Sequence, residues 1–212
     1  TGILDSEDGQ ITSDGDVVTL DFYDSLGYTY TAKFNVKQTT TAAAGNTMTL
    51  TCTDILNSDG VSIFTANNIP DATKTTDLAN FMGGTNGVTL TYDSTTGKIA
   101  SIGASASGAV TVSSTTENAD KFFSVNMSAL NGISTAFTNS NTTAGQINVN
   151  VATLYNEDNK GTSTASGKGG DLYNSGAGKG CRVGTMSAIS IGTDGKINAT
   201  YTNGQTKLLG QI

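Results

Sequence analysis

The chain has 212 residues and a formal net charge of -7 at pH 7, and only 14% of its residues are charged. Nucleic-acid binding depends on clustered Lys and Arg, so this balance argues against a nucleic-acid partner and against an anionic membrane surface. The chain has no histidine, which excludes Ser-His-Asp and Cys-His catalysis and every metal site that uses histidine. No apolar run reaches the ~18 residues of a membrane span, and no signal-peptide pattern opens the sequence.

Residues 16–23 and 28–37 alternate between apolar and polar side chains, with the sequence DSLG between them. This alternation is typical of a strand with one buried face, and Asp first with Gly last suits a β-turn, so we predict a hairpin. Residues 47–53 alternate in the same way and place Cys52 on the apolar side, so we predict that Cys52 points into the core. Cys181 follows a glycine-rich stretch and is expected at the surface, with both thiols free.

The rest of the chain repeats this pattern. The sequence GTDG at 192–195 and the Asn-Gly pair after the next strand are typical hairpin turns. We expect the last strand to return from that pair and to close the core with Leu208 or Leu209 beside Ile197 and Ala199. Further strands are predicted over residues 61–65, 88–93, 98–102, 109–113, 121–127, 146–154, 182–191, 196–202 and 205–212.

Helix signals are few. Residues 75–82 predict one short helix, with Thr75 or Thr76 as its N-cap and Asp77 in its first turn. Residues 128–133 predict a single helical turn.

The whole chain is predicted to be all-β. Residues 156–180 are rich in Gly and Ser and have little to bury, so we expect a long exposed loop there. We predict one domain over 1–212, an antiparallel β-barrel or sandwich built from hairpins, with long Gly/Ser/Thr-rich loops and at most one or two short helices.

Two stretches resemble ligand-binding loops without meeting their requirements. In SGAGKGC, residues 175–181, a Walker A loop would need Gly near the position of Leu172 or Tyr173, and Ser or Thr where Gly180 follows the lysine. A calcium loop needs oxygen ligands at fixed positions, and the stretch 156–161 would place Lys160 and Gly167 at two of them. The same register excludes the acidic residues near the start of the sequence, Asp5, Glu7 and Asp8.

Other aspartates occur at predicted turns, because a short carboxylate bonds the nearby backbone N–H groups. They are Asp14, Asp24, Asp59, Asp93 and Asp194. Turn chemistry accounts for them without the carboxylate pair that glycoside hydrolysis needs. We therefore predict that the protein is not an enzyme and has no catalytic residues, no metal site and no cofactor.

Several blocks of the sequence follow one known family pattern in order. Residues 189–212, ISIGTDGKINATYTNGQTKLLGQI, match the closing pattern ISI-x-x-DG-x-I-x-x-x-Y-x-NGQ-x-x-x-LGQI in turns and spacing. Similar blocks are VVTLDFYDSLGYTYTAKFNVK at 17–37, with the hallmark YDSLG, then GVTLTYDSTTGKI at 87–99, FFSVNMSALNGIS at 122–134 and the entry segment TGILDS at 1–6. In these blocks the chain resembles the outer, D2-type β-domain of bacterial flagellar hook proteins.

The chain departs from that pattern in three places. Residues 38–86 and 135–180 fit it poorly and are enlarged insertions, and the family's YA-G element has the sequence CRVG here, with Cys181 at the aromatic position. The helical segments that build the inner tube are absent from the sequence. The resemblance therefore implies the outer β-domain alone, without the flanking inner helical domains.

The resemblance implies a structural role in the bacterial flagellum. The domain would form the outer surface of the curved hook, which transmits torque from the motor to the filament. Its expected location is extracellular, after export through the flagellar secretion channel. Its expected partners are other copies in a helical polymer, the hook cap, the hook-length ruler and the hook–filament junction proteins.

A bending tube needs outer contacts that slide, and polar contacts bridged by water exchange at little cost. The strand face with Thr29, Thr31, Lys33 and Asn35 is of this kind. We therefore expect the isolated domain to be a monomer that self-associates only within the polymer.

Two alternatives remain from the sequence. The first is a cell-surface β-sandwich adhesin or carbohydrate-binding module, although such modules present stacking aromatic residues and this chain has no Trp. The second is covalent cross-linking between subunits. It follows from the resemblance, because some hooks join a Cys to a Lys of the next subunit. Cys181 lies near Lys168 and Lys179 in the sequence.

Overall fold

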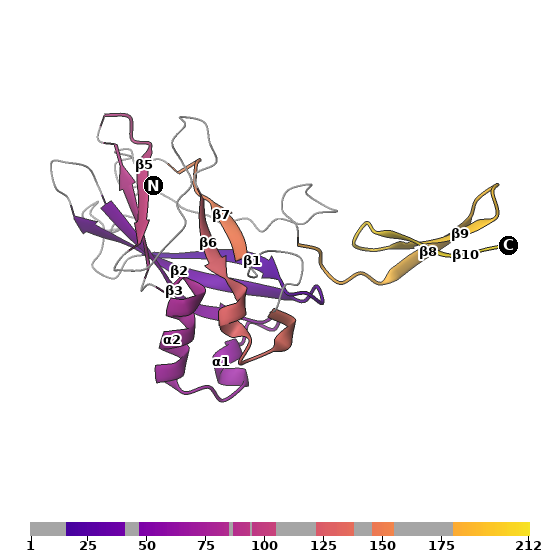
Figure 1. The fold of residues 1–212 in the computed structure, drawn as a ribbon, viewed down its shortest axis with the longest axis horizontal. Helices are drawn as coiled ribbons and strands as arrows, with labels where there is room; N and C mark the ends of the chain where they lie inside the picture. Colours follow the sequence, from indigo (N-terminus) through magenta and orange to yellow (C-terminus); the bar gives the residue numbers. More distant parts are fainter. Residues whose placement is uncertain are drawn as a thin grey trace.

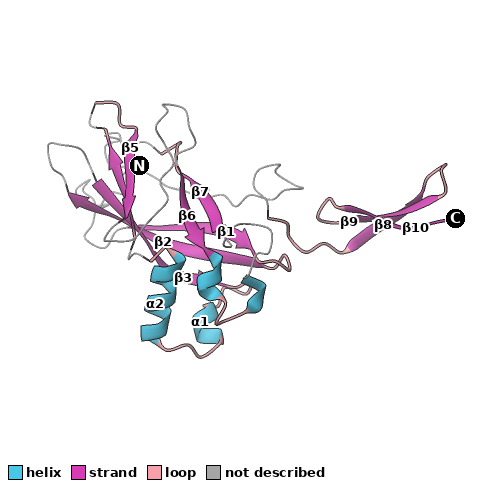
Figure 2. Ribbon diagram, in the orientation of Figure 1, coloured by secondary structure: helices cyan, strands magenta, loops and turns pink. Residues whose placement is uncertain are grey.

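The structure is a computed structural model and describes residues 16–40, 47–84, 87–93, 95–104, 122–137, 146–154 and 180–212. It is mostly antiparallel β-sheet with two short α-helices, so the predicted fold class is confirmed (Figure 2). The elements in chain order are β1 (Asp16–Tyr23), β2 (Thr29–Thr40), β3 (Thr47–Leu56), α1 (Ile63–Ala66), α2 (Asp71–Phe81), β4 (Val88–Tyr92), β5 (Ile99–Ala104), β6 (Phe122–Asn126), the 3-10 turns η1 (Met127–Leu130) and η2 (Thr135–Phe137), β7 (Gln146–Asn150), β8 (Met186–Ile191), β9 (Lys196–Tyr201) and β10 (Thr206–Gln211).

The largest sheet has five antiparallel strands in the order β1-β2-β3-β4-β5 and is curled into half of a barrel (Figure 1). Its strand register pairs apolar residues with one another on the concave face, because side chains directly opposite each other share a face. The pairs are Phe22 with Tyr30, Ala32 with Ile55, Phe34 with Cys52, Val36 with Leu50, Met48 with Leu90, and Leu90 with Ile102.

The concave face is covered by α1, α2, the two 3-10 turns and the β6–β7 hairpin (Figure 1). Four fully buried phenylalanines, Phe64, Phe81, Phe123 and Phe137, provide much of this cover. Phe123 of β6 meets Phe34 of β2 edge-on, with ring centroids 6.5 Å apart. This contact joins the hairpin layer to the sheet, so both layers share one core.

The predicted strand at 61–65 is wrong. Residues 63–66 form α1, and only Ser62 makes an isolated bridge, to Leu56. Ile63 and Phe64 are neighbours and are both buried, at 3% and 1% exposure. A strand would send adjacent side chains to opposite faces, whereas a helical turn at the edge of the core buries both.

The predicted helix exists, but it begins earlier than residue 75. α2 starts at Asp71, with Pro70 as its N-cap residue at φ -61°, a value that suits a helix start. The hydroxyls of Thr75 and Thr76 donate to the carbonyls one turn back, so neither threonine caps the helix. The expected first-turn role of Asp77 is therefore also wrong, and Asp71 occupies the first turn instead.

The other strand predictions that fall on described residues are confirmed, with shifted ends. β7 stops at Asn150 and β8 begins at Met186, each shorter than its alternating stretch. The helical turn expected within 128–133 is η1, displaced by one residue at its start. The strand predicted at 109–113 lies outside the described residues, as do the loop at 156–179 and most of the enlarged segment 135–180. The segment 38–86, in contrast, supplies β3, α1 and α2 to the core.

The last three strands form a separate sheet in the order β10-β9-β8, which Figure 1 shows beyond one end of the five-stranded sheet. Within the described part of the chain, no residue after 180 belongs to the main core cluster. Leu208 and Leu209 are 53% and 50% exposed, so the prediction that either closes the core is wrong. Ala199 is buried within its own small sheet.

Candidate interaction surfaces

Three of the turn aspartates, Asp24, Asp93 and Asp194, have the local roles that the sequence predicts. Asp24 accepts hydrogen bonds from the N–H groups of Leu26 and Tyr28, each at 2.9 Å. Asp93 accepts from two N–H groups of its own turn, and Asp194 accepts from Lys196 N–H. Each carboxylate serves a different turn, so these residues do not form a paired acid–base site.

Asp59 differs from the other turn aspartates. In its turn the side chain of Asn57 accepts the N–H groups of Asp59 and Val61, both at 3.0 Å.

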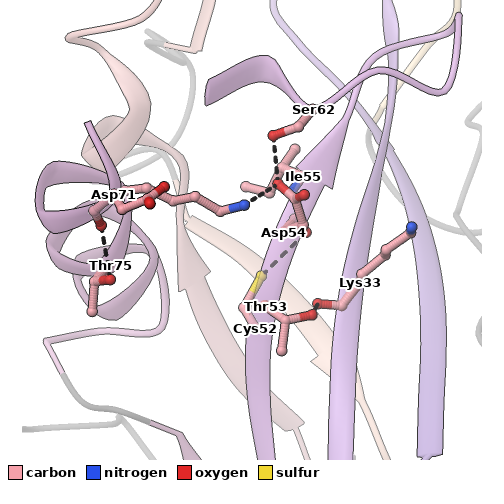
Figure 3. A network of polar contacts seen from close by, with 9 residues as sticks. Lys33, Cys52, Thr53, Asp54, Ile55, Ser62, Asp71 and Thr75 are labelled. Atoms are coloured by element: carbon pink, nitrogen blue, oxygen red, sulfur yellow. Dashed lines mark hydrogen bonds and ion pairs between the residues drawn. The ribbon is translucent and has the colours of Figure 1, made fainter. Parts of the chain in front are cut away.

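A polar network that the sequence did not predict surrounds Asp54 of β3 (Figure 3). Its Oδ1 atom accepts from Ser62 Oγ at 2.7 Å and from Ile55 N–H at 2.9 Å, and lies 3.1 Å from Lys74 Nζ of α2. Lys74 also lies over the Phe64 ring, 5.5 Å from its centroid. The network ties both helices to β3, which is a structural role.

Cys52 lies beside this network and is unsuited to nucleophilic chemistry. Its thiol is buried and donates to the Asp54 carbonyl at 3.7 Å. Burial raises the pKa of the Cys52 thiol to about 12, so the reactive thiolate is absent at neutral pH. The predicted core position of Cys52 is confirmed, and neither Cys52 nor Cys181 forms a disulfide within the described part of the chain.

We predict that the protein loses stability at alkaline pH. Burial raises the pKa of Cys52 from 9.0, and of Tyr92 from 10.0, to about 12 in each case. The unfolded chain therefore releases these protons first, so the stabilisation is complete below pH 9 and is lost as the pH rises toward 12. Each group contributes about 1.4 kcal/mol per pH unit in its window. Urea unfolding at pH 8, 10 and 11.5 measures the loss.

Tyr92→Phe removes one of these groups and keeps the ring, so its unfolding free energy should fall less steeply above pH 10. Tyr28→Phe, at an exposed position, should follow the wild-type curve. Parallel curves for the wild type and Tyr92→Phe would contradict the prediction.

The convex face of the five-stranded sheet is polar and rich in threonine. Thr31 Oγ1 donates to Asp21 Oδ1 at 2.7 Å across the first two strands, the kind of cross-strand pair that stabilises a sheet. The predicted polar alternation of β2 is therefore present on this face. Its paired residues are Thr19 with Lys33, Asp21 with Thr31, Asn35 with Thr51, Thr49 with Thr89, and Thr91 with Ser101.

The C-terminal sheet carries the opposite kind of surface. The register places Ile189 opposite Ala199, and Ile191 opposite Ile197, so these residues share one face. Ile189 and Ile191 are 56% and 62% exposed, and Met186, opposite Tyr201, is 55% exposed. The other face has the polar pair Ser190 with Asn198, together with Leu208 of β10 opposite Asn198. We call the first side the apolar face (Met186, Ile189, Ile191, Ile197, Ala199 and Tyr201). Within it Ala199 is buried, and Lys207 of β10 lies opposite Ala199.

Contiguous exposed apolar patches are enriched at interaction sites, so this face is a candidate interaction surface. The sequence shows the alternation of β8 and β9, but nothing in it indicates that the alternating residues stay outside the core.

The remaining ligand candidates lie outside the described residues: Asp5, Glu7, Asp8, Asp14, Tyr173, the stretch 156–161, Gly167, Lys168 and Lys179. Among the residues that the structure does describe, no group of three His, Cys, Asp or Glu side chains is placed to hold a metal ion. No helix in the described ranges is long and apolar enough to span a membrane.

Comparison with protein-family models and with curated protein sequences found no match for this chain.

Proposed function

We propose that this chain is the outer β-domain of a bacterial flagellar hook subunit. The observation that carries the proposal is the sequence of residues 189–212, whose turns and spacing follow the closing block of hook proteins. In this chain the block is a meander with turns at Gly192–Gly195 and Tyr201–Gln205, each closed by backbone hydrogen bonds. The spacing of the block thus corresponds to one complete supersecondary unit.

The polar convex face supports a position on the outside of a flexible polymer. It offers hydroxyl and amide groups, such as those of Thr49, Thr51 and Thr89, with few fixed charges. Such groups bind neighbours through water and exchange partners at little cost when the geometry changes. Outer subunit contacts that lengthen and shorten in a curved tube require this behaviour.

The apolar face supports the proposal that the C-terminal sheet packs against other parts of the hook. Burying several half-exposed side chains such as Ile189 and Ile191 stabilises a contact by roughly 25 cal/mol per Å². Apolar packing fixes one geometry, in contrast to the water-bridged convex face. We therefore propose that β8–β10 is the anchored end of the domain and that the five-stranded sheet is its outward end.

Immunogold labelling tests the proposed function directly. Antibodies against the body of the domain, residues 16–154, are expected to decorate the hook on intact cells of the source bacterium. Labelling spread over the cell envelope, together with saturable binding on a glycan array, would overturn the proposal in favour of an adhesin or carbohydrate-binding module.

The isolated chain is expected to be a monomer at micromolar concentration, with a mass of 21.6 kDa. Its net charge of -7 opposes association, and the apolar face covers only one side of a small sheet. Light scattering coupled to size exclusion measures the mass. A tight dimer at this concentration would count against an association that is confined to the polymer.

A further inference from the structure

A short segment, residues 181–185, precedes β8, and we call it the strap. The strap is bound closely to the β9–β10 turn. Thr202 N–H donates to the Thr185 carbonyl at 2.8 Å, and Thr185 N–H donates to Thr202 Oγ1 at 3.0 Å. Asn203 is 3% exposed, and its Nδ2 atom donates to the Arg182 carbonyl at 2.8 Å. These bonds make the strap part of the C-terminal sheet.

Packing adds to this attachment. The Asn203 side chain fills the space above Gly184, where an added Cβ atom would lie 2.5 Å from Asn203 Cγ. The same side chain also accepts from Gln205 N–H at 3.1 Å, which fixes its orientation in the turn. The strap and the turn therefore fit each other closely.

The strap meets the body at the turn between β1 and β2. One backbone hydrogen bond joins the described residues of the two parts, from Val183 N–H to the Gly27 carbonyl at 2.9 Å. Gly27 has φ +86°, and a Cβ atom there would lie 2.7 Å from both the Cys181 carbonyl oxygen and the Val183 nitrogen. Glycine is thus needed at this position for its backbone conformation and for the close approach of the strap.

The turn itself is held firmly to the body. Ser25 N–H donates to the Ala136 carbonyl at 2.9 Å, and Gly27 N–H donates to the Asp24 carbonyl at 3.1 Å. Asp24 is 8% exposed and also accepts the Tyr30 hydroxyl at 3.3 Å. Among the described residues, the strap is therefore bound by several hydrogen bonds on the C-terminal side, and one backbone hydrogen bond joins it to the turn between β1 and β2.

We propose that the contact between Gly27 and Val183 is a joint at which the C-terminal sheet detaches and swings as one unit with its strap. A net hydrogen bond is worth about 1 kcal/mol, so the docked and undocked forms differ little in free energy. Opening the joint breaks neither sheet, because each keeps its own strand pairing. The proposal rests on these contacts alone and is independent of the proposed function.

Amide hydrogen exchange followed by NMR tests the joint with Gly27→Ala. The added Cβ atom displaces the strap, so exchange of the Val183 amide should accelerate by about fivefold, to nearly the rate of an open amide. The Thr202 amide, whose acceptor lies in the strap, should keep its wild-type rate. An unchanged Val183 rate would overturn the proposal, as would equal acceleration at Val183 and Thr202, because the strap would then not move with the sheet.

Gly60→Ala is the matched control. Gly60 also has a positive φ, of +75°, in a β-turn, but a Cβ atom there would meet nothing within 4 Å. The Gly60→Ala variant has the free-energy cost of a positive φ at alanine but no steric clash with the strap. The exchange rate of the Val183 amide should therefore not change.

A second variant, Val183→Pro, removes the donor of the joint and leaves the body untouched. Spin labels at Thr75 and Ser190, both exposed, report the distance between the two parts in a chain with Cys52→Ala and Cys181→Ser. The distance distribution should broaden in Val183→Pro and Gly27→Ala and stay narrow in Gly60→Ala. Equally narrow distance distributions in all three variants would overturn the proposal of a joint.

Discussion

Phe123→Ala is expected to lower the free energy of unfolding by about 3–5 kcal/mol. Phe123 is fully buried and meets the Phe34 ring between the β6–β7 hairpin and the five-stranded sheet. Truncation removes the transfer free energy of the ring and leaves a cavity between two layers that are each held by their own hydrogen bonds. Denaturant unfolding followed by circular dichroism measures the change.

Phe122→Ala is the control for this prediction. Phe122 precedes Phe123 in the same strand and is only partly buried, so its truncation should cost about 1 kcal/mol. Equal losses for the two variants would mean that the hairpin does not share a core with the sheet.

Ile189→Asp is expected to abolish assembly of the hook polymer, as an outcome of the proposed function. Ile189 stands near the middle of the apolar face and is 56% exposed. A carboxylate there would lose its hydration without a partner when the face is covered, which costs several kcal/mol. The isolated domain keeps the position open to solvent, so its melting temperature should hardly change. Electron microscopy of polymer assembled from the full subunit gives the readout.

Ser190→Asp introduces the same charge one residue further along β8, on the opposite face of the sheet, where Ser190 pairs with Asn198. This variant should assemble normally. Assembly of both variants would show that the apolar face is not a contact in the polymer, whereas failure of both would point to the charge alone.

The hairpins were predictable from the sequence because their signals are local. Alternation with a period of two fixes which side chains of β1 and β2 face the core, and a one-residue slip would reverse the whole set. The turns at Asp24 and Asn203 carry residues whose side chains bond the backbone within the turn.

The helices show where local signals fail. Ile63 and Phe64 belong to a short apolar run that suits a strand or a buried helical turn equally well. The choice depends on the space beside β3, where both side chains are buried. Similarly, Thr75 and Thr76 are good capping residues, but Pro70 starts the helix one turn earlier.

By itself, the sequence determined the antiparallel β class, most strand positions and the turns, because alternation and turn chemistry act between near neighbours. The tertiary structure alone decided that β8–β10 stays outside the core and leaves Ile189 and Leu208 exposed. It also decided that Gly27 must accommodate Val183, more than 150 residues away in the sequence. An alternating pattern specifies that a strand has an apolar side, but the packing of distant segments determines what covers that side.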